Sequence, residues 1–176
     1  DFIKESKELG KPFMLMCQHK APHRTWMPAL RHLHLYDDID IPEPKTLFDQ
    51  YEGRIPAQHQ EMEIDRHMYI DHALFTDLTP DLNFPKQRRP SEDRAAYINM
   101  KRMTPDQLKT WRAAYDPKDK AFREAKLTGR DLVRWKFQRY AKNYLRAIKG
   151  VDENLARLRK ALEDQDLADN TVFVYS

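Results

Sequence analysis

The chain has 176 residues, of which 40% are hydrophobic and 34% charged, and its formal net charge at pH 7 is +3. This composition excludes a disordered chain, and the near balance of acidic and basic residues argues against a polyanion-binding protein. No run approaches the ~20 apolar residues that a membrane-spanning helix needs.

The first residues are typical of the end of a helix. Phe2, Ile3 and Leu9 fit its last turns, and Gly10 can cap it. The sequence begins with neither an initiator methionine nor a segment of signal-peptide character. We therefore expect residues 1–176 to be an internal segment of a single domain that is truncated at both ends.

A short apolar run, 13–17, follows Lys11-Pro12. Such a run, bounded by Gly and Pro, predicts a buried strand of a parallel sheet. Cys17 ends the run and is the single cysteine, so an intrachain disulfide and a cysteine-based zinc site are excluded. We expect Cys17 to be a buried structural thiol.

The middle of the chain predicts little long regular structure. Prolines interrupt the region from about 19 to 60, and a loop of that length is uncommon in a compact domain unless it serves function. Short helices and turns are expected over about 61–127. Thr104-Pro105-Asp106-Gln107 predicts a capped helix start, and Pro117 is expected to end that helix.

The clearest periodicity runs from about 131 to 165. Apolar residues recur there at alternating spacings of four and three, which predicts a long α-helix with one apolar stripe toward the core and the basic residues mostly elsewhere. The stripe comprises Phe137, Ala141, Tyr144, Ile148, Val151, Leu155, Leu158 and Leu162. Thr128 with Asp131 gives a capping-box signal at the start of this helix.

Asp169-Asn170 then turns the chain into a second apolar strand, 171–176. A helix followed by a turn and a strand is half of a βαβ unit. Together with strand 13–17, this pattern predicts the α/β class: part of a mainly parallel sheet sandwiched by helices.

The residues best suited to chemistry lie in segment 18–26, Gln18-His19-Lys20-Ala21-Pro22-His23-Arg24-Thr25-Trp26, which we call the basic loop. It leaves the carboxyl end of the first predicted strand, where ligands bind in open α/β sheets. Its imidazoles, ammonium, guanidinium and indole could converge on the oxygens of a small oxyanion. On the residues alone, a solvated surface loop explains the pattern equally well.

Two other polar groups suggest a metal less strongly. Asp37-Asp38-Ile39-Asp40 has the clustered carboxylates that hard cations take, but a solvated loop is the favoured interpretation. His32 and His34 would need a further ligand, so we expect an ordinary pair of loop histidines.

Five segments occur in an order that resembles one protein family. Lys11-Pro12-Phe13-Met14-Leu15 is similar to a KPFFL strand, and Lys20-Ala21-Pro22-His23-Arg24-Thr25-Trp26 is similar to a KAPHRPW segment. Segment 41–49 resembles IPEPPTLFDDY, segment 135–145 resembles the opening of a long helix, and 151–154 with 169–172 resembles VDENVGRL…DNTIVVYTSD. The family is that of the type I, formylglycine-dependent sulfatases, of the alkaline-phosphatase-like fold.

The resemblance implies a sulfuric ester hydrolase that degrades a sulfated glycan. It implies that His23 contacts the sulfate ester oxygens and assists the leaving-group oxygen as a proton donor, a role that a near-neutral pKa permits. Lys20 and His19 line the same strip, while Arg24 and Trp26 are expected to bind the substrate beyond the sulfate. Family members are periplasmic or extracellular, which is the localisation expected here.

The sequence also departs from the family. The nucleophile motif Cys/Ser-x-Pro-x-Arg is absent, since Cys17 is followed by Gln18-His19-Lys20. In the family that motif and the calcium ligands lie outside the matching segment, so the formylglycine and the calcium are expected outside it too, with no metal ligand in residues 1–176. The segment alone should therefore be inactive.

Two alternatives stay open. One is a phosphonate or phosphate ester hydrolase of the same superfamily. The other is a non-catalytic basic helical binding module, whose basic residues would be Arg130, Arg134, Lys136, Arg139, Lys142, Arg146 and Lys149. Because nearby acidic residues offset these charges, no nucleic-acid partner is expected. The oligomeric state is left open.

Overall fold

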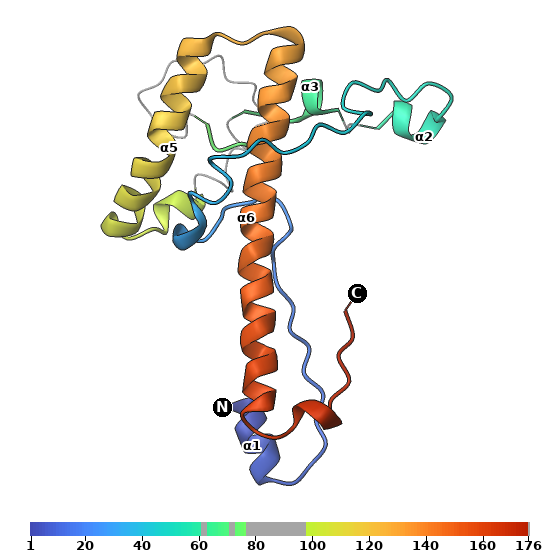
Figure 1. Cartoon of the computed structure of the whole chain (residues 1–176), viewed down its shortest axis with the longest axis vertical. Coiled ribbons are helices and arrows are strands. Elements are labelled where there is room, and N and C mark those ends of the chain that lie inside the picture. The colour runs from blue at the N-terminus through green and yellow to red at the C-terminus, as the bar shows by residue number, and fades with distance from the viewer. Residues whose placement is uncertain (61–62, 71–72, 77–97, 176) are drawn as a thin grey trace.

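The computed structural model describes residues 1–60, 63–70, 73–76 and 98–175 (Figure 1). The regular elements of these ranges are helical. They are α1 (Phe2–Glu8), η1 (Leu30–His32), α2 (Ile55–Gln58), α3 (Ile64–His67), α5 (Pro105–Ala125), α6 (Gly129–Glu163) and η2 (Ala168–Asn170). Residues 98–101 are also helical.

The long helix α6 is the axis of the molecule. Figure 1 shows α3 and α5 beside its N-terminal half and α1 beside its C-terminal end. We call the first group the head: η1, 73–76, α3, α5 and the first half of α6. We call the second group the foot: α1, segment 11–17, the last turns of α6, η2 and segment 171–175.

The predicted helix starts are confirmed. Thr104 caps α5 with a complete capping box: the Gln107 N–H donates to Thr104 Oγ1 (3.3 Å), and the Thr104 N–H donates to Gln107 Oε1 (2.9 Å). Thr128 is the N-cap of α6, but its side chain makes no capping hydrogen bond. At the other end of the chain, α1 stops before Gly10, which has a φ of +62° as a capping glycine requires.

The prediction that Pro117 ends its helix is wrong. Pro117 lies inside α5, which continues to Ala125. The residues beyond it are held by α6: Asp119 pairs with Arg139 at 2.8 Å, and Phe122 stacks on Trp135 with ring centroids 3.8 Å apart. This tertiary packing outweighs the backbone hydrogen bond that proline removes.

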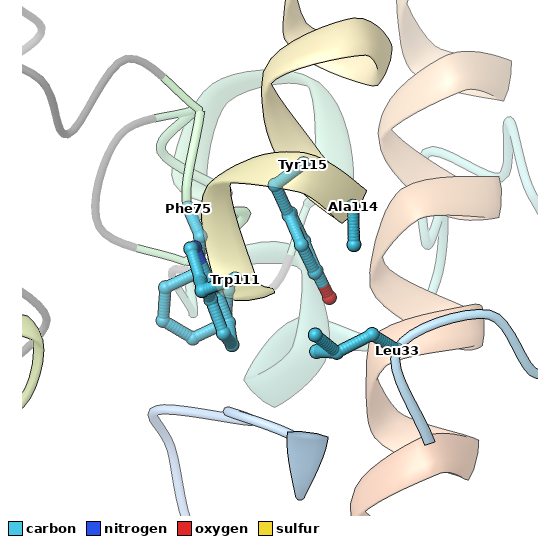
Figure 2. Packing of buried hydrophobic residues seen from close by; sticks show 5 residues of the cluster. All are labelled: Leu33, Phe75, Trp111, Ala114 and Tyr115. Atoms are coloured by element: carbon cyan, nitrogen blue, oxygen red, sulfur yellow. The ribbon is translucent and has the colours of Figure 1, made fainter. Parts of the chain in front are cut away.

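The hydrophobic core lies in the head. Trp111, Ala114 and Tyr115 of α5 face Leu33 and Phe75 from irregular segments (Figure 2). The Trp111 and Tyr115 rings stack with centroids 4.3 Å apart, and Phe75 meets Trp111 edge-on at 5.7 Å. All five side chains are at most 3% exposed. The core therefore joins α5 to loops rather than to a sheet.

The buried face of α6 differs from the expected apolar stripe. In its first half, Lys136, Arg139, Asn143 and Arg146 are buried, whereas most of the predicted stripe is half-buried. Of that stripe, Leu162 alone, at 3%, is fully buried. Of the basic residues predicted to lie off the stripe, Arg134, Arg157 and Lys160 are exposed, whereas Arg146 is buried, so the prediction is wrong for Arg146.

The physical reason is that irregular segments and the short helix α3 pack here, and their carbonyl groups need donors. Long cationic side chains of α6 supply them. Lys136 Nζ donates to Asp65 O (2.6 Å), Arg139 Nε to Leu74 O (2.9 Å) and Arg146 Nε to Leu35 O (2.7 Å). An apolar side chain at these positions would leave the carbonyl groups unpaired.

The predicted α/β sheet is not formed by the described residues. Segments 13–17 and 171–175 run as extended chain without strand pairing, and residue 176 lies outside the described ranges. Met14 is 80% exposed and Val172 is 87% exposed. A strand requires a neighbour that supplies N–H and C=O groups, and none of the described segments does so. Cys17 is exposed as well, so the prediction of a buried thiol is wrong.

Candidate functional site

The basic loop is folded on itself by short backbone bonds. The His23 N–H donates to Lys20 O (2.8 Å), and the Met27 N–H donates to Thr25 O (2.9 Å). Lys20, His23 and Arg24 are exposed, and His19 is half-buried. The loop therefore presents an ammonium, an imidazole and a guanidinium to solvent within five residues of chain, 20–24.

The ring of His23 has a defined orientation. Its Nδ1 contacts the Arg24 carbonyl oxygen. Because a carbonyl oxygen only accepts, this contact places a proton on Nδ1. Nε2 is then the ring nitrogen that can exchange a proton with a ligand, and in the protonated ring it is a donor.

Trp26 is oriented differently from the rest of the loop. Its Nε1 donates to Pro22 O (2.9 Å), and its ring packs edge-on against Tyr140 of α6, with centroids 4.7 Å apart. Tyr144, one turn further along α6, lies at 6.4 Å. Of the five predicted site residues, Trp26 is thus the one that is turned onto the long helix.

A shallow hollow lies in the foot, away from the basic loop. It is lined by Phe2, Leu15 and Ala161 among others, and none of the five predicted site residues contributes to it.

A second polar cluster, centred on Asp37, was missed by sequence reasoning. Asp37 Oδ1 accepts from Lys118 Nζ (2.7 Å) and from Arg146 NH2 (2.6 Å), while its Oδ2 lies 3.1 Å from His34 Nδ1. Asp37, Asp38 and Asp40 are exposed, as expected of a solvated loop, but Asp37 is also bonded to side chains of α5 and α6. The three partners come from three separate segments, so no local sequence pattern could have indicated the cluster.

The charges of this cluster shift two pKa values. Burial acts to raise the pKa of Asp37, but the hydrogen bonds from Lys118 and His34, with the charges of Lys118 and Arg146, outweigh it and hold the pKa below its ordinary value. The pKa of Lys118 is lowered, chiefly by burial. These are the features of a structural ion-pair network.

The neighbouring histidines do not converge. His32 Nε2 lies 3.0 Å from Glu153 Oε2, whereas His34 is paired with Asp37. Within the ranges that the structure describes, no three His, Cys, Asp or Glu side chains are placed to hold a metal ion. None of the helices in those ranges is long and apolar enough to cross a membrane.

Three of the seven basic residues proposed for a helical binding module are buried in the structure. Lys136, Arg139 and Arg146 are at most 6% exposed and are bonded inside the head. They are therefore not available to an external polyanion.

Comparisons with known proteins agree on one family. The sulfatase family profile matches residues 1–176. The N-acetylglucosamine-6-O-sulfatase of Bacteroides thetaiotaomicron is 37% identical over 172 residues, which are 98% of this chain and 30% of that protein. A solved structure described as a complex with its substrate D-glucosamine-2-N,6-O-disulfate matches with a TM-score of 0.81 and 37% identity, covering 97% of this chain and 33% of the other. The chain thus spans about a third of the length of these relatives.

Proposed function

Because this chain belongs to the sulfatase family, we propose that it forms the part of a sulfuric ester hydrolase that holds the sulfate group of the substrate. The observation that carries the proposal is the full-length family match combined with an exposed basic loop that carries His23. A sulfate ester is a tetrahedral anion, and the loop offers the cations and N–H donors that such a group requires.

In this proposal His23 donates a proton from Nε2 to the ester oxygen as the bond to sulfur breaks. Negative charge develops on that oxygen, and a proton donor there lowers the barrier. Lys20 neutralises the non-bridging oxygens, and Arg24, which is exposed as well, binds the substrate beyond the sulfate. His19, half-buried before them, lines the same strip.

We further propose a 6-O-sulfated glucosamine as the substrate, within a sulfated glycan. Support comes from the name of one relative, N-acetylglucosamine-6-O-sulfatase, and from the disulfated glucosamine bound in the similar structure. Both proteins are 37% identical to this chain over nearly all of its length.

The proposal assigns the remaining chemistry to residues outside this segment. The 176 residues contain no Cys/Ser-x-Pro-x-Arg motif, and the described ones hold no cluster fit for a metal. A formylglycine and a calcium ion, as the family implies, would be supplied by the rest of a single catalytic domain. Isolated residues 1–176 would then be inactive. Export to the periplasm or the cell exterior is proposed by analogy with the family.

The test is sulfate release from 6-O-sulfated N-acetylglucosamine by the complete protein that carries these residues. Substitution His23→Ala is expected to lower kcat by about 10²- to 10⁴-fold, the usual contribution of a positioned acid. The control His59→Ala changes an exposed histidine at the end of α2 and should stay within about twofold. Near-normal hydrolysis by His23→Ala would remove His23 from the site.

The same assay decides between the sulfatase and the phosphonate or phosphate ester hydrolase. Faster turnover of the matching phosphate ester by the complete protein would replace the sulfatase proposal.

A further inference from the structure

Trp26 contacts both its own loop and the long helix α6. Its indole N–H is donated to Pro22 O at 2.9 Å, and its ring packs on Tyr140 and Tyr144. The two tyrosines belong to the rigid helix α6, whereas the loop itself has no regular structure. Trp26 therefore connects an irregular exposed segment to the most extended element of the fold.

We propose that Trp26 is a positioning residue for the sulfate-binding loop: it attaches the loop to α6 and fixes the location of His23 through the Pro22 carbonyl group. This inference rests on the proposed function and deepens it. It assigns Trp26 a role different from the expected contact with substrate beyond the sulfate.

The first argument is the position of His23 in the chain. The bond from Trp26 to Pro22 O spans four residues and closes a short loop in which His23 is the residue next to Pro22. The His23 N–H is itself bonded to Lys20 O (2.8 Å). The peptide group between Pro22 and His23 is thus held at its oxygen by the indole and at its N–H by Lys20 O.

The second argument is that the functional parts of the indole are already engaged. The N–H is the single hydrogen-bond donor of a tryptophan side chain, and Pro22 occupies it. The ring is half-buried against Tyr140, whereas Lys20, His23 and Arg24 are exposed. A residue placed to bind a sugar would offer its ring face or its donor to the solvent side.

A second attachment lies beside the first. Asn99 Nδ2 donates to Thr25 Oγ1 at 3.3 Å, so the residue before Trp26 is also held, in this case by the helical segment 98–101. The two contacts fix the downstream end of the basic loop. A misplacement of about 1 Å at a reacting group can cost about 10²-fold in rate, so this attachment matters for catalysis.

The test uses Trp26→Phe and Tyr140→Leu in the complete protein. Trp26→Phe keeps an aromatic ring against α6 but removes the donor to Pro22 O. Tyr140→Leu keeps the indole and removes the aromatic surface on which it rests. The matched control is Trp135→Phe, because Trp135 stacks on Phe122 of α5 instead of on the loop. Thermal unfolding of each variant verifies that it is folded.

Three quantities are measured: kcat and KM for 6-O-sulfated N-acetylglucosamine, inhibition by inorganic sulfate, and hydrogen–deuterium exchange of the peptide that covers 19–25. For Trp26→Phe we expect kcat to fall about 10- to 100-fold, inhibition by sulfate to weaken in parallel, and exchange of the loop to accelerate. Tyr140→Leu should show the same three changes, and Trp135→Phe none of them.

The alternatives give different results. If Trp26 contacts the sugar directly, KM for the sugar substrate rises while inhibition by inorganic sulfate and exchange of the loop stay unchanged, and the inference is overturned. Faster exchange with unchanged kcat would overturn it as well, because the attachment would then have no catalytic consequence. If the wild-type protein hydrolyses no sulfate ester while Trp26→Phe still accelerates exchange, the proposed function fails and the attachment of the loop stands.

Discussion

The head and the foot share one helix but bury very different surfaces. In the head, α6 and α5 enclose a core of five hydrophobic residues together with bonded cations. In the foot, Met14, Val174 and Tyr175 are at least 80% exposed although they are apolar. Exposed apolar patches of this kind mark surfaces that normally meet a partner.

The difference shows where the 176 residues supply their own packing and where they do not. The head is completed by segments of this chain, whereas the two extended segments of the foot lack neighbours among the described residues. The chain spans about a third of the length of its relatives. Variants of the two regions should therefore respond unequally.

The largest difference in lost stability between head and foot is expected when ion pairs are broken. Asp119→Ala leaves Arg139 buried without its carboxylate, and the free energy of unfolding should fall by about 3–5 kcal/mol. Glu163→Ala breaks a pair with Arg159 of the same length, 2.8 Å, but at the exposed end of α6, and should cost at most about 1 kcal/mol. Urea unfolding of the 176-residue chain measures both. Equal losses would contradict the contrast between head and foot.

A similar inequality is expected for leucines. Leu33 is 1% exposed in the core of the head, so Leu33→Ala should destabilise the chain by about 2–5 kcal/mol. Leu15 is 44% exposed in the foot, so Leu15→Ala should lower the free energy of unfolding by less than about 1 kcal/mol. Thermal unfolding followed by circular dichroism gives the comparison, and a large loss for Leu15→Ala would show that the foot has a core of its own.

The Asp37 cluster should make the stability of the head depend on pH. The folded-state pKa of Asp37 lies below its ordinary value, so its contribution is present above about pH 4, the unfolded-state pKa, and is lost as the pH falls through the folded-state pKa. Asp37→Asn should cost about 1 kcal/mol at pH 7, since the side chain is 32% exposed. The difference between the unfolding midpoints of the two proteins should shrink as the pH falls below about 4. A constant difference across this range would exclude Asp37 as the titrating group.

The smallest effect on stability is expected at the end of the foot. Val172→Thr combined with Val174→Thr changes side chains that are 87% and 85% exposed, so the free energy of unfolding should shift by less than about 0.5 kcal/mol. Aggregation of the 176-residue chain, followed by light scattering, should nevertheless decrease because an exposed apolar segment becomes polar. Unchanged aggregation would mean that the chains do not associate through segment 171–175.

Local signals in the sequence were sufficient for the starts of the two long helices. The capping box at Thr104 and the period of α6 depend on residues three or four positions apart, and both were predicted correctly. The end of α5 was predicted wrongly, because the contacts that stabilise the helix beyond Pro117 come from α6. Long-range contacts of this kind leave no short-range pattern.

The buried face of α6 was mispredicted for a related reason. Hydrophobic periodicity assumes that a helix packs against apolar surface, but here the neighbours are the short helix α3 and irregular segments, whose carbonyl groups accept hydrogen bonds. Lys136 and Arg146 are buried because they donate to these carbonyl groups. For the site, sequence similarity led us to propose the basic loop and its residues, while the attachment of Trp26 to α6 required the structure.

The hydrogen bonds from α6 to backbone carbonyl groups limit how the sequence of this protein can vary. A carbonyl oxygen is the same whichever side chain its residue carries, so Leu35, Asp65 and Leu74 can be replaced without loss of these bonds. The donors on the helix have no such freedom, because an arginine or lysine of the right length is required at each position. Variation among homologous proteins should accordingly accumulate in the loops that surround α6, and a new substrate preference could arise there without refolding the head.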